Sequence, residues 1–384
     1  MRTGVSLAWL QLTRDRRRFF AALSGIAFAV MLMLSQLGFE DALMSSAGLI
    51  HDHLTADLIL ISPLYQFVIN PRTFTERRLY QTLGVDGVAS VESVYIGQAS
   101  FKNPLDRSER TIFVIGFKPD SPLLNAPGIA ENLEKIRRPG AVLFDAIRRP
   151  EYGPVSESFL QTGKVSTEVG GRQVDIAGLF QLGTSFGIDG TLVMSDETFM
   201  RVVPGREHGI VNIGLIRVKP GADPNRVRSD IDALLPDDVR LLSHAEFLDL
   251  ERTYWMTYTP TGFVFTMGVI MAILVGSIIV YQILYSDVTD HLPEYATMKA
   301  MGYPDRYLFK IVLQQSSILS IFGFFPGVVV AEFLYRVARD ATHLPLHMTV
   351  QRLIGVYILT AFMCGLSAML AMRRLKAADP ADIF

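Results

Sequence analysis

The stretch SDVTDHLPEYATMKAMGYPDR, residues 286–306, lies between two long apolar runs. Its residues predict a helix of about two to three turns. Pro293 suits a first helical turn, and Glu294 complements the positive end of the helix dipole. Gly302 can adopt the left-handed conformation that ends a helix, and Pro304 blocks its continuation. A helix this short is not stable alone in water, so it needs a surface to lie against.

The apolar residues of this predicted helix recur at every third position. They form a narrow stripe of Leu292, Tyr295, Met298 and Met301. The opposite, polar side carries Asp290, Glu294, Thr297 and Lys299. Two surfaces can receive such a stripe, namely the lipid headgroups on which interfacial helices rest or a soluble partner. Composition alone leaves both alternatives open.

Four runs without Asp, Glu, Lys or Arg are long enough to cross a bilayer, which takes about 20 apolar residues. They cover residues 19–39, 253–286, 311–331 and 353–372. The second run has its apolar centre at residues 262–285, and we expect its excess to extend into water. We interpret the first run as an uncleaved span, because it is too long for a signal peptide and no small-residue cleavage site follows it.

Basic residues set the expected orientation. The cluster RDRRR at residues 14–18 should stay in the cytoplasm. Four crossings then place the C-terminus, with Arg373, Arg374 and Lys376, in the cytoplasm too. The predicted fold class is therefore a membrane protein with four transmembrane α-helices, N-in and C-in. A large α+β extracytoplasmic domain separates the first two helices, and its pattern predicts hairpins at residues 88–117 and 164–177.

These patterns also predict the domain boundaries. We expect a cytoplasmic amphipathic helix at residues 1–18, the first crossing at 19–39, the extracytoplasmic domain with helical stalks at both ends at 40–252, a stalk end and the second crossing at 253–285, a cytoplasmic coupling loop at 286–306, the third crossing at 307–335, a short outer loop at 336–352, the fourth crossing at 353–372 and a cytoplasmic tail at 373–384.

The third crossing contains two features with alternative interpretations. Pro326 lies in the sequence GFFPG between Gly323 and Gly327, where it forms either a fixed bend or a hinge. Glu332 stands at the outer end of the same run, with Arg336 four residues later. We expect a paired terminal charge at Glu332, although an acid within a membrane helix is also a functional candidate.

The sequence offers little for an enzyme. The net charge of −2 argues against nucleic-acid binding, and the single cysteine, Cys364, excludes an internal disulfide. His343 and His347 have metal-ligand spacing, but Pro345 between them breaks the helix that this spacing requires. No hydrolase, metalloprotease or phosphate-loop motif is present. We therefore expect a non-catalytic chain without metal or cofactor, and any ATP must be bound by a separate subunit.

The motif EYATMKAMG at residues 294–302 resembles the E-I-G-x-x-K-A-x-G signature that follows the second membrane helix in ABC permeases of the FtsX/MacB (type VII) superfamily. The longer stretch at residues 290–303 is most similar to DevC-type permeases. Ala296 departs from the glycine that the wider family often has, without disturbing the helix. The segments LAWLQLT at 7–13 and AADPADI at 377–383 look like the family's N-terminal amphipathic segment and its C-terminal tail.

The resemblance implies a permease homodimer in the bacterial inner membrane, with its large domain in the periplasm. Two copies of a separate ABC ATPase, similar to DevA, would dock on the coupling helix. The residues that match the coupling helix are Leu292, Pro293, Glu294, Tyr295, Ala296, Met298, Lys299, Met301 and Gly302. The family's mechanism is mechanotransmission, in which ATP-driven motion reaches the periplasmic domain and no substrate passes between the membrane helices.

DevC-type systems act in tripartite efflux with a membrane-fusion adaptor, similar to DevB, and a TolC-like outer-membrane channel. They are associated with the export of glycolipids or other hydrophobic compounds. Two alternatives belong to the same superfamily: a lipoprotein-releasing permease, and an FtsX-like transmembrane regulator of cell-wall hydrolases.

Overall fold

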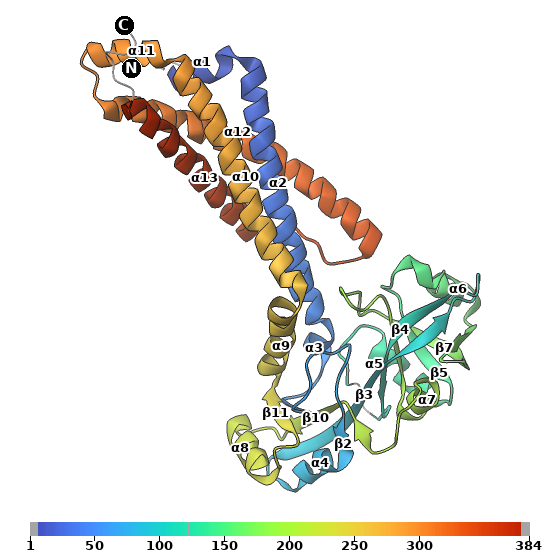
Figure 1. Cartoon of the computed structure of the whole chain (residues 1–384). Helices are drawn as coiled ribbons and strands as arrows, with labels where there is room; N and C mark the ends of the chain where they lie inside the picture. The colour runs from blue at the N-terminus through green and yellow to red at the C-terminus, as the bar shows by residue number, and fades with distance from the viewer. Residues whose placement is uncertain (1–6, 121–122, 378–384) are drawn as a thin grey trace. The chain divides into compact units, whose positions relative to one another are not determined.

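The computed structural model describes residues 7–120 and 123–377, which separate into two compact units (Figure 1). The first, the helical unit, takes in Met1–Ala42, Thr261–Arg339 and Leu346–Phe384. The second, the sheet domain, takes in Leu43–Pro260 and Asp340–Pro345. The tail motif expected at residues 377–383 lies outside the described residues except for Ala377.

Among these described residues, four helices are long and apolar enough to cross a membrane, which confirms the expected fold class. They are α2 (Arg16–Ala47), α10 (Pro260–Asp290), α12 (Asp305–Thr342) and α13 (Val350–Ala377). Two short helices, α1 (Leu7–Arg14) and α11 (Leu292–Ala300), complete the helical unit.

The amphipathic helix expected at residues 1–18 is interrupted at Asp15. Helix α1 ends at Arg14, and α2 begins at Arg16. The Asp15 carboxylate accepts hydrogen bonds from the backbone N–H groups of Arg17 and Arg18, at 3.1 and 3.3 Å. Aspartate in this position satisfies the free N–H groups of a helix start, so it begins a new helix within the polar sequence.

The outer loop expected at residues 336–352 is shorter in the structure, because α12 continues to Thr342 and α13 already begins at Val350. In these polar turns the carboxylate of Glu332 pairs with Arg336 at 3.2 Å and with Arg339 at 3.8 Å. The helix ends where His343 adopts a φ of +56°. The end of the apolar run thus marks the end of the hydrophobic segment, not the end of the helix.

The glycines beside Pro326 bring α12 close to α2. A Cβ on Gly323 would lie 2.6 Å from Ile26 Cγ2, and one on Gly327 would lie 2.7 Å from the Ala27 carbonyl oxygen. Small residues four apart allow such close approach between membrane helices. Pro326 lies within α12, which runs unbroken through it. Gly323 and Gly327 therefore have a packing role, and a hinge at Pro326 remains a prediction.

The sheet domain is built on a mixed sheet of nine strands. In spatial order these are β11 (Arg240–Ser243), β1 (Leu58–Ile61), β10 (Ile213–Val218), β3 (Val88–Lys102), β4 (Glu109–Phe117), β8 (Thr191–Ser195), β5 (Ala141–Asp145), β7 (Arg172–Phe180) and β6 (Val165–Val169). A two-stranded sheet joins β2 (Phe74–Thr75) to β9 (Ile210–Val211).

Both predicted hairpins are confirmed. Strands β3 and β4 pair antiparallel, as do β6 and β7 around Gly170 and Gly171, whose φ angles are +56° and +73°. The end of β3 also pairs with β6, with Phe101 opposite Val169. Strands β3, β4, β8, β5, β7 and β6 therefore form a closed ring of neighbours, which leaves fewer free edges.

Helices cover the sheet and lie at the ends of the domain. They are α3 (Leu49–His53), α4 (Glu76–Gln81), α5 (Ile129–Asn132), α6 (Val155–Thr162), α7 (Asp196–Val202), α8 (Pro224–Leu234) and α9 (His244–Thr253), with a π-helical turn at Tyr254–Tyr258. Consecutive residues of one strand lie in different apolar cores, as Leu58 and Ile59 do. Both faces of the sheet are thus buried.

Candidate functional site: helix α11

Helix α11 lies across the end of the helical unit, beside α1 (Figure 1). Pro293 occupies its first turn. At its end Gly302 has a φ of +91°, in the left-handed region. The N–H of Tyr303 donates to the Met298 carbonyl at 3.1 Å, and that of Gly302 donates to the Lys299 carbonyl at 3.0 Å. These two bonds form a Schellman motif, so the stop signal expected from the sequence operates in the structure.

The buried face of α11 differs from the expected stripe. Tyr295 and Ala296 are buried, at 1% and 7% exposure, while Leu292 and Met298 are half-buried. Met301 is 65% exposed. A helix of 3.6 residues per turn buries positions three and four apart, so Ala296 replaces Met301 on the inner face. Leu292, Tyr295 and Met298 of the expected stripe therefore face the helical unit, and Met301 does not share that face.

Opposite this face, α11 and the turn after it present an exposed surface. From the residues matched to the coupling helix it contains Pro293, Glu294, Lys299, Met301 and Gly302, and it also contains Thr297 and Ala300. Tyr303 and Tyr307, which the sequence did not single out, are 44% and 41% exposed, with ring centroids 5.0 Å apart. We call this exposed set the outer face of α11. Tyrosine and methionine are enriched in protein interfaces, so this surface suits a protein partner.

The two charged residues of the motif have partners within the chain. Glu294 Oε1 lies 3.7 Å from Arg14 Nη1, and Lys299 Nζ lies 3.2 Å from Asp305 Oδ1. The Glu294 and Lys299 side chains are 52% and 41% exposed. Exposed pairs of this kind contribute about 0–1 kcal/mol. Glu294 and Lys299 can therefore leave these ion pairs and bind charged groups of a partner at little cost in free energy.

The acid at the outer end of α12 behaves as a paired terminal charge, since Glu332 contacts both Arg336 and Arg339. Nearby, Arg352 donates to the Asp41 carboxylate at 2.6 Å and to the Tyr335 hydroxyl at 3.3 Å. These contacts tie α13, α2 and α12 together at the end of the helical unit away from α11.

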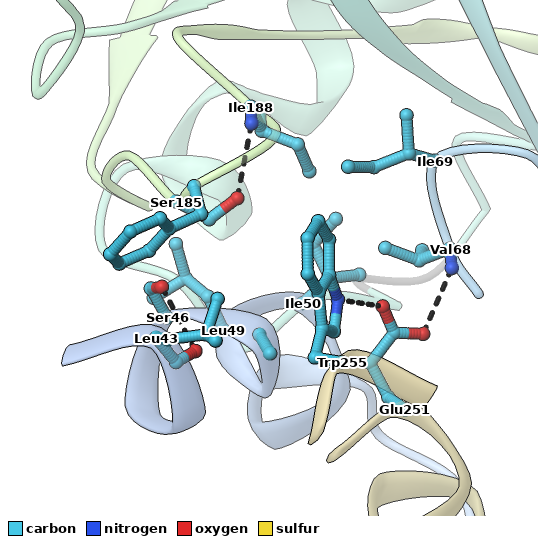
Figure 2. A pocket seen from close by; sticks show the side chains of 12 residues that line it. Leu43, Ser46, Leu49, Ile50, Val68, Ile69, Ser185, Ile188, Glu251 and Trp255 are labelled. Atoms are coloured by element: carbon cyan, nitrogen blue, oxygen red, sulfur yellow. Dashed lines mark hydrogen bonds between the residues drawn. The ribbon is translucent and has the colours of Figure 1, made fainter. Parts of the chain in front are cut away.

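The sheet domain contains a separate buried acid, Glu251 of α9 (Figure 2). Its carboxylate accepts hydrogen bonds from the Val68 N–H at 2.9 Å and from the Trp255 indole N–H at 3.0 Å. Burial raises the pKa of Glu251 to about 7. Burial also lowers the pKa of His51, which lies 3.6 Å away, to about 3. Across residues 7–120 and 123–377, no group of three or more His, Cys, Asp and Glu side chains could hold a metal ion.

Within residues 7–120 and 123–377, the chain has four membrane-length helices, a large α+β domain after the first of them and a capped helix between the second and third, as expected for a multi-span membrane protein. Residues 266–380 match the family described as FtsX-like permease C-terminal. This segment, which includes α11, is similar to the C-terminal domain of FtsX-like permeases, and the match agrees with the FtsX/MacB resemblance of the motif at residues 294–302.

Two solved structures are similar to parts of the chain. The periplasmic region of MacB from Actinobacillus actinomycetemcomitans has a TM-score of 0.36 and 8% identity, covering 52% of this chain and 94% of that one. The extracellular domain of the noncanonic ABC-type transporter YknZ from Gram-positive bacteria has a TM-score of 0.31 and 13% identity, covering 49% and 99%. No curated protein sequence matches the chain.

Proposed function

We propose that the chain is the permease subunit of an ABC-type transporter and that a separate ATPase subunit docks on the outer face of α11. The observation that carries the proposal is a capped helix inside the FtsX-like domain whose outer face exposes Met301, Tyr303 and Tyr307. The sequence holds no phosphate loop, so ATP would be bound by the partner.

The connections of α11 support a mechanical role. Only His291 separates it from α10, and residues 301–304 separate it from α12. A displacement of α11 by the closing ATPase would therefore act directly on two membrane-length helices. Helix α12 packs closely on α2 through Gly323 and Gly327, so its motion would reach α2 as well. This arrangement supports mechanotransmission, with Pro326 as a bend or hinge between the two ends of α12.

The finer assignment follows the resemblance of residues 290–303 to DevC-type permeases. On that basis the chain would act as a homodimer in the inner membrane, with α11 in the cytoplasm and the sheet domain in the periplasm. It would work with a membrane-fusion adaptor and a TolC-like channel to export a hydrophobic or glycolipid-like compound. Mass spectrometry of the complex isolated in mild detergent tests this, because a lipoprotein carrier or a hydrolase activator in place of the adaptor favours the alternatives.

Docking on α11 is tested with the variant Thr297→Pro and its matched control Thr297→Ala. Proline removes the N–H at position 297 and clashes with the carbonyl one turn earlier, at a cost of about 3 kcal/mol or more. Alanine keeps the N–H and removes the γ-methyl group and the hydroxyl, which donates to the Pro293 carbonyl at 2.9 Å. Thr297 is exposed, so both variants should insert into the membrane.

We expect Thr297→Pro to abolish stimulation of the co-purified ATPase and Thr297→Ala to preserve it. Stimulation that survived in Thr297→Pro would contradict docking on α11.

A further inference from the structure

A buried polar cluster lies beneath α11. It consists of Gln11 of α1, Asp287 of α10, Tyr295 of α11 and Gln315 of α12, and so brings four helices together. Gln315 is 0%, Tyr295 1% and Gln11 7% exposed. Buried polar groups are costly unless they are hydrogen-bonded. Apolar side chains would pack here without this cost, so we expect the polar cluster to have a specific role.

Gln315 is the centre of the buried polar cluster. Its Nε2 donates to Asp287 Oδ2 at 2.7 Å and lies 3.3 Å from Gln11 Oε1. The acceptor of the first bond is a side-chain carboxylate, shared between α10 and α12. The other carboxylate oxygen of Asp287 lies 3.6 Å from Nδ1 of His291, the residue immediately before α11. Asp287 therefore contacts both α12 and the start of α11.

Tyr295 places α11 itself in this cluster. Burial and the neighbouring Asp287 carboxylate raise the pKa of its hydroxyl, which keeps it protonated. Among the described residues, no hydrogen bond of normal geometry joins the Tyr295 hydroxyl, Gln11 Nε2 or Gln315 Oε1 to a partner. Each unfilled buried group costs about 1–3 kcal/mol.

We propose that Gln11, Asp287 and Gln315 are positioning residues that join α1, α10 and α12 beneath α11 and hold the start of α11 through the Asp287–His291 contact, so that these helices follow α11 together. The role in force transmission rests on the proposed docking function, whereas the hold on α11 is a property of this chain alone. The exposed Arg14–Glu294 pair is a poor substitute, because its side chains are 77% and 52% exposed and such pairs contribute little.

Four variants separate this role from simple packing. Gln315→Leu keeps a similar side-chain volume but removes both hydrogen bonds. Gln315→Glu places a second carboxylate against Asp287. The double variant Asp287→Asn/Gln315→Glu restores a carboxylate–amide pair with the partners exchanged. Ser320→Ala is the matched control, because Ser320 is also buried on α12 but its hydroxyl donates within that helix, to the Ser317 carbonyl at 2.9 Å.

The test is electron–electron double resonance on the full chain in lipid nanodiscs. Spin labels replace Thr297 of α11 and Leu313 of α12, which is 39% exposed, in a background with Cys364, the single cysteine, changed to Ala. We expect narrow distance distributions for the unmodified background, Ser320→Ala and the exchanged pair. Gln315→Leu and Gln315→Glu should broaden the distribution at least twofold.

Two results would overturn the proposal. One is a distribution for Gln315→Leu as narrow as that of the background chain. The other is an exchanged pair as broad as Gln315→Glu alone, which would show that hydrogen-bond pairing is irrelevant. If Gln315→Leu fails to fold, the comparison of Gln315→Glu with the exchanged pair decides the question.

A second arm separates this proposal from the docking function. A photo-crosslinking residue at Met301 in the complex with the ATPase reports docking independently of the distance measurement. Broadening in Gln315→Leu without any crosslink to a nucleotide-binding subunit would refute docking and leave the positioning role standing. A crosslink without broadening would refute the positioning role and leave docking standing.

Discussion

The variant Gly302→Ala tests whether the capped end of α11 is needed for function. Gly302 has a φ of +91°, and a Cβ built there meets no described atom within 4 Å. The substitution therefore introduces no clash. Its free-energy cost comes only from holding alanine, which has a Cβ, in a left-handed backbone conformation. That cost is about 1–2 kcal/mol. It corresponds to a change of about 5- to 30-fold in the ratio of ordered to frayed helix ends.

Hydrogen exchange read by mass spectrometry over residues 292–304 measures this change. The amides of Gly302 and Tyr303 donate to the carbonyls of Lys299 and Met298, so their protection should fall by the same factor of about 5 to 30. ATPase stimulation should fall in parallel. The matched control is Gly221→Ala in the sheet domain, where φ is +88° and a Cβ again meets no described atom within 4 Å. It carries the same strain and should leave both readouts unchanged.

Two results would refute this reasoning. Unchanged exchange in Gly302→Ala would show that the left-handed cap does not hold the helix end. Faster exchange with ATPase stimulation as in the unmodified chain would show that an ordered α11 is not what the ATPase recognises.

Two further predictions concern the helical unit and the sheet domain. Gly327→Ala places a Cβ 2.7 Å from the Ala27 carbonyl oxygen, so we expect thermal unfolding in detergent to show that the free energy of unfolding falls by about 1–3 kcal/mol. The control is Gly355→Ala, whose Cβ meets no described atom within 4 Å and which should leave the free energy of unfolding unchanged. Because burial raises the pKa of Glu251 from 4.5 to about 7, the native protein keeps a proton that the unfolded chain releases. The resulting stability, about 3 kcal/mol, is complete below pH 4.5 and is lost as the pH rises through 7. Trp255 donates to Glu251, so its fluorescence in a Trp9→Phe chain should titrate near pH 7 and lose this titration in Glu251→Gln.

The sequence predicted the features that depend on local signals. The four apolar runs specify membrane-length helices because about 20 apolar residues are required wherever the span lies. The limits of α11 follow from Pro293 and Gly302, whose backbone preferences act within a few residues. The turn at Gly170 and Gly171 is of the same kind. Each of these signals can be evaluated without knowledge of the rest of the chain.

Features that depend on distant contacts were missed. The pairing of β3 with β6 joins segments that no local pattern connects, so the closed ring of strands was not foreseen. The hydrogen bond from Gln315 to Asp287 joins two different membrane helices, and its partners look like ordinary polar residues in the sequence. Met301 does not share the buried face of Tyr295, because it follows the last turn of α11, where an every-third-residue stripe no longer describes the geometry.

The central claim is that the outer face of α11 is the docking surface for a separate ATPase, and site-specific photo-crosslinking tests it most directly. The probe replaces Met301, which is 65% exposed, and the control probe replaces Leu160 of the sheet domain, which is 76% exposed. In intact cells, we expect the Met301 probe to capture a nucleotide-binding subunit and the Leu160 probe not to do so. Capture of lipid alone at Met301, or equal capture of that subunit at Leu160, would contradict the account.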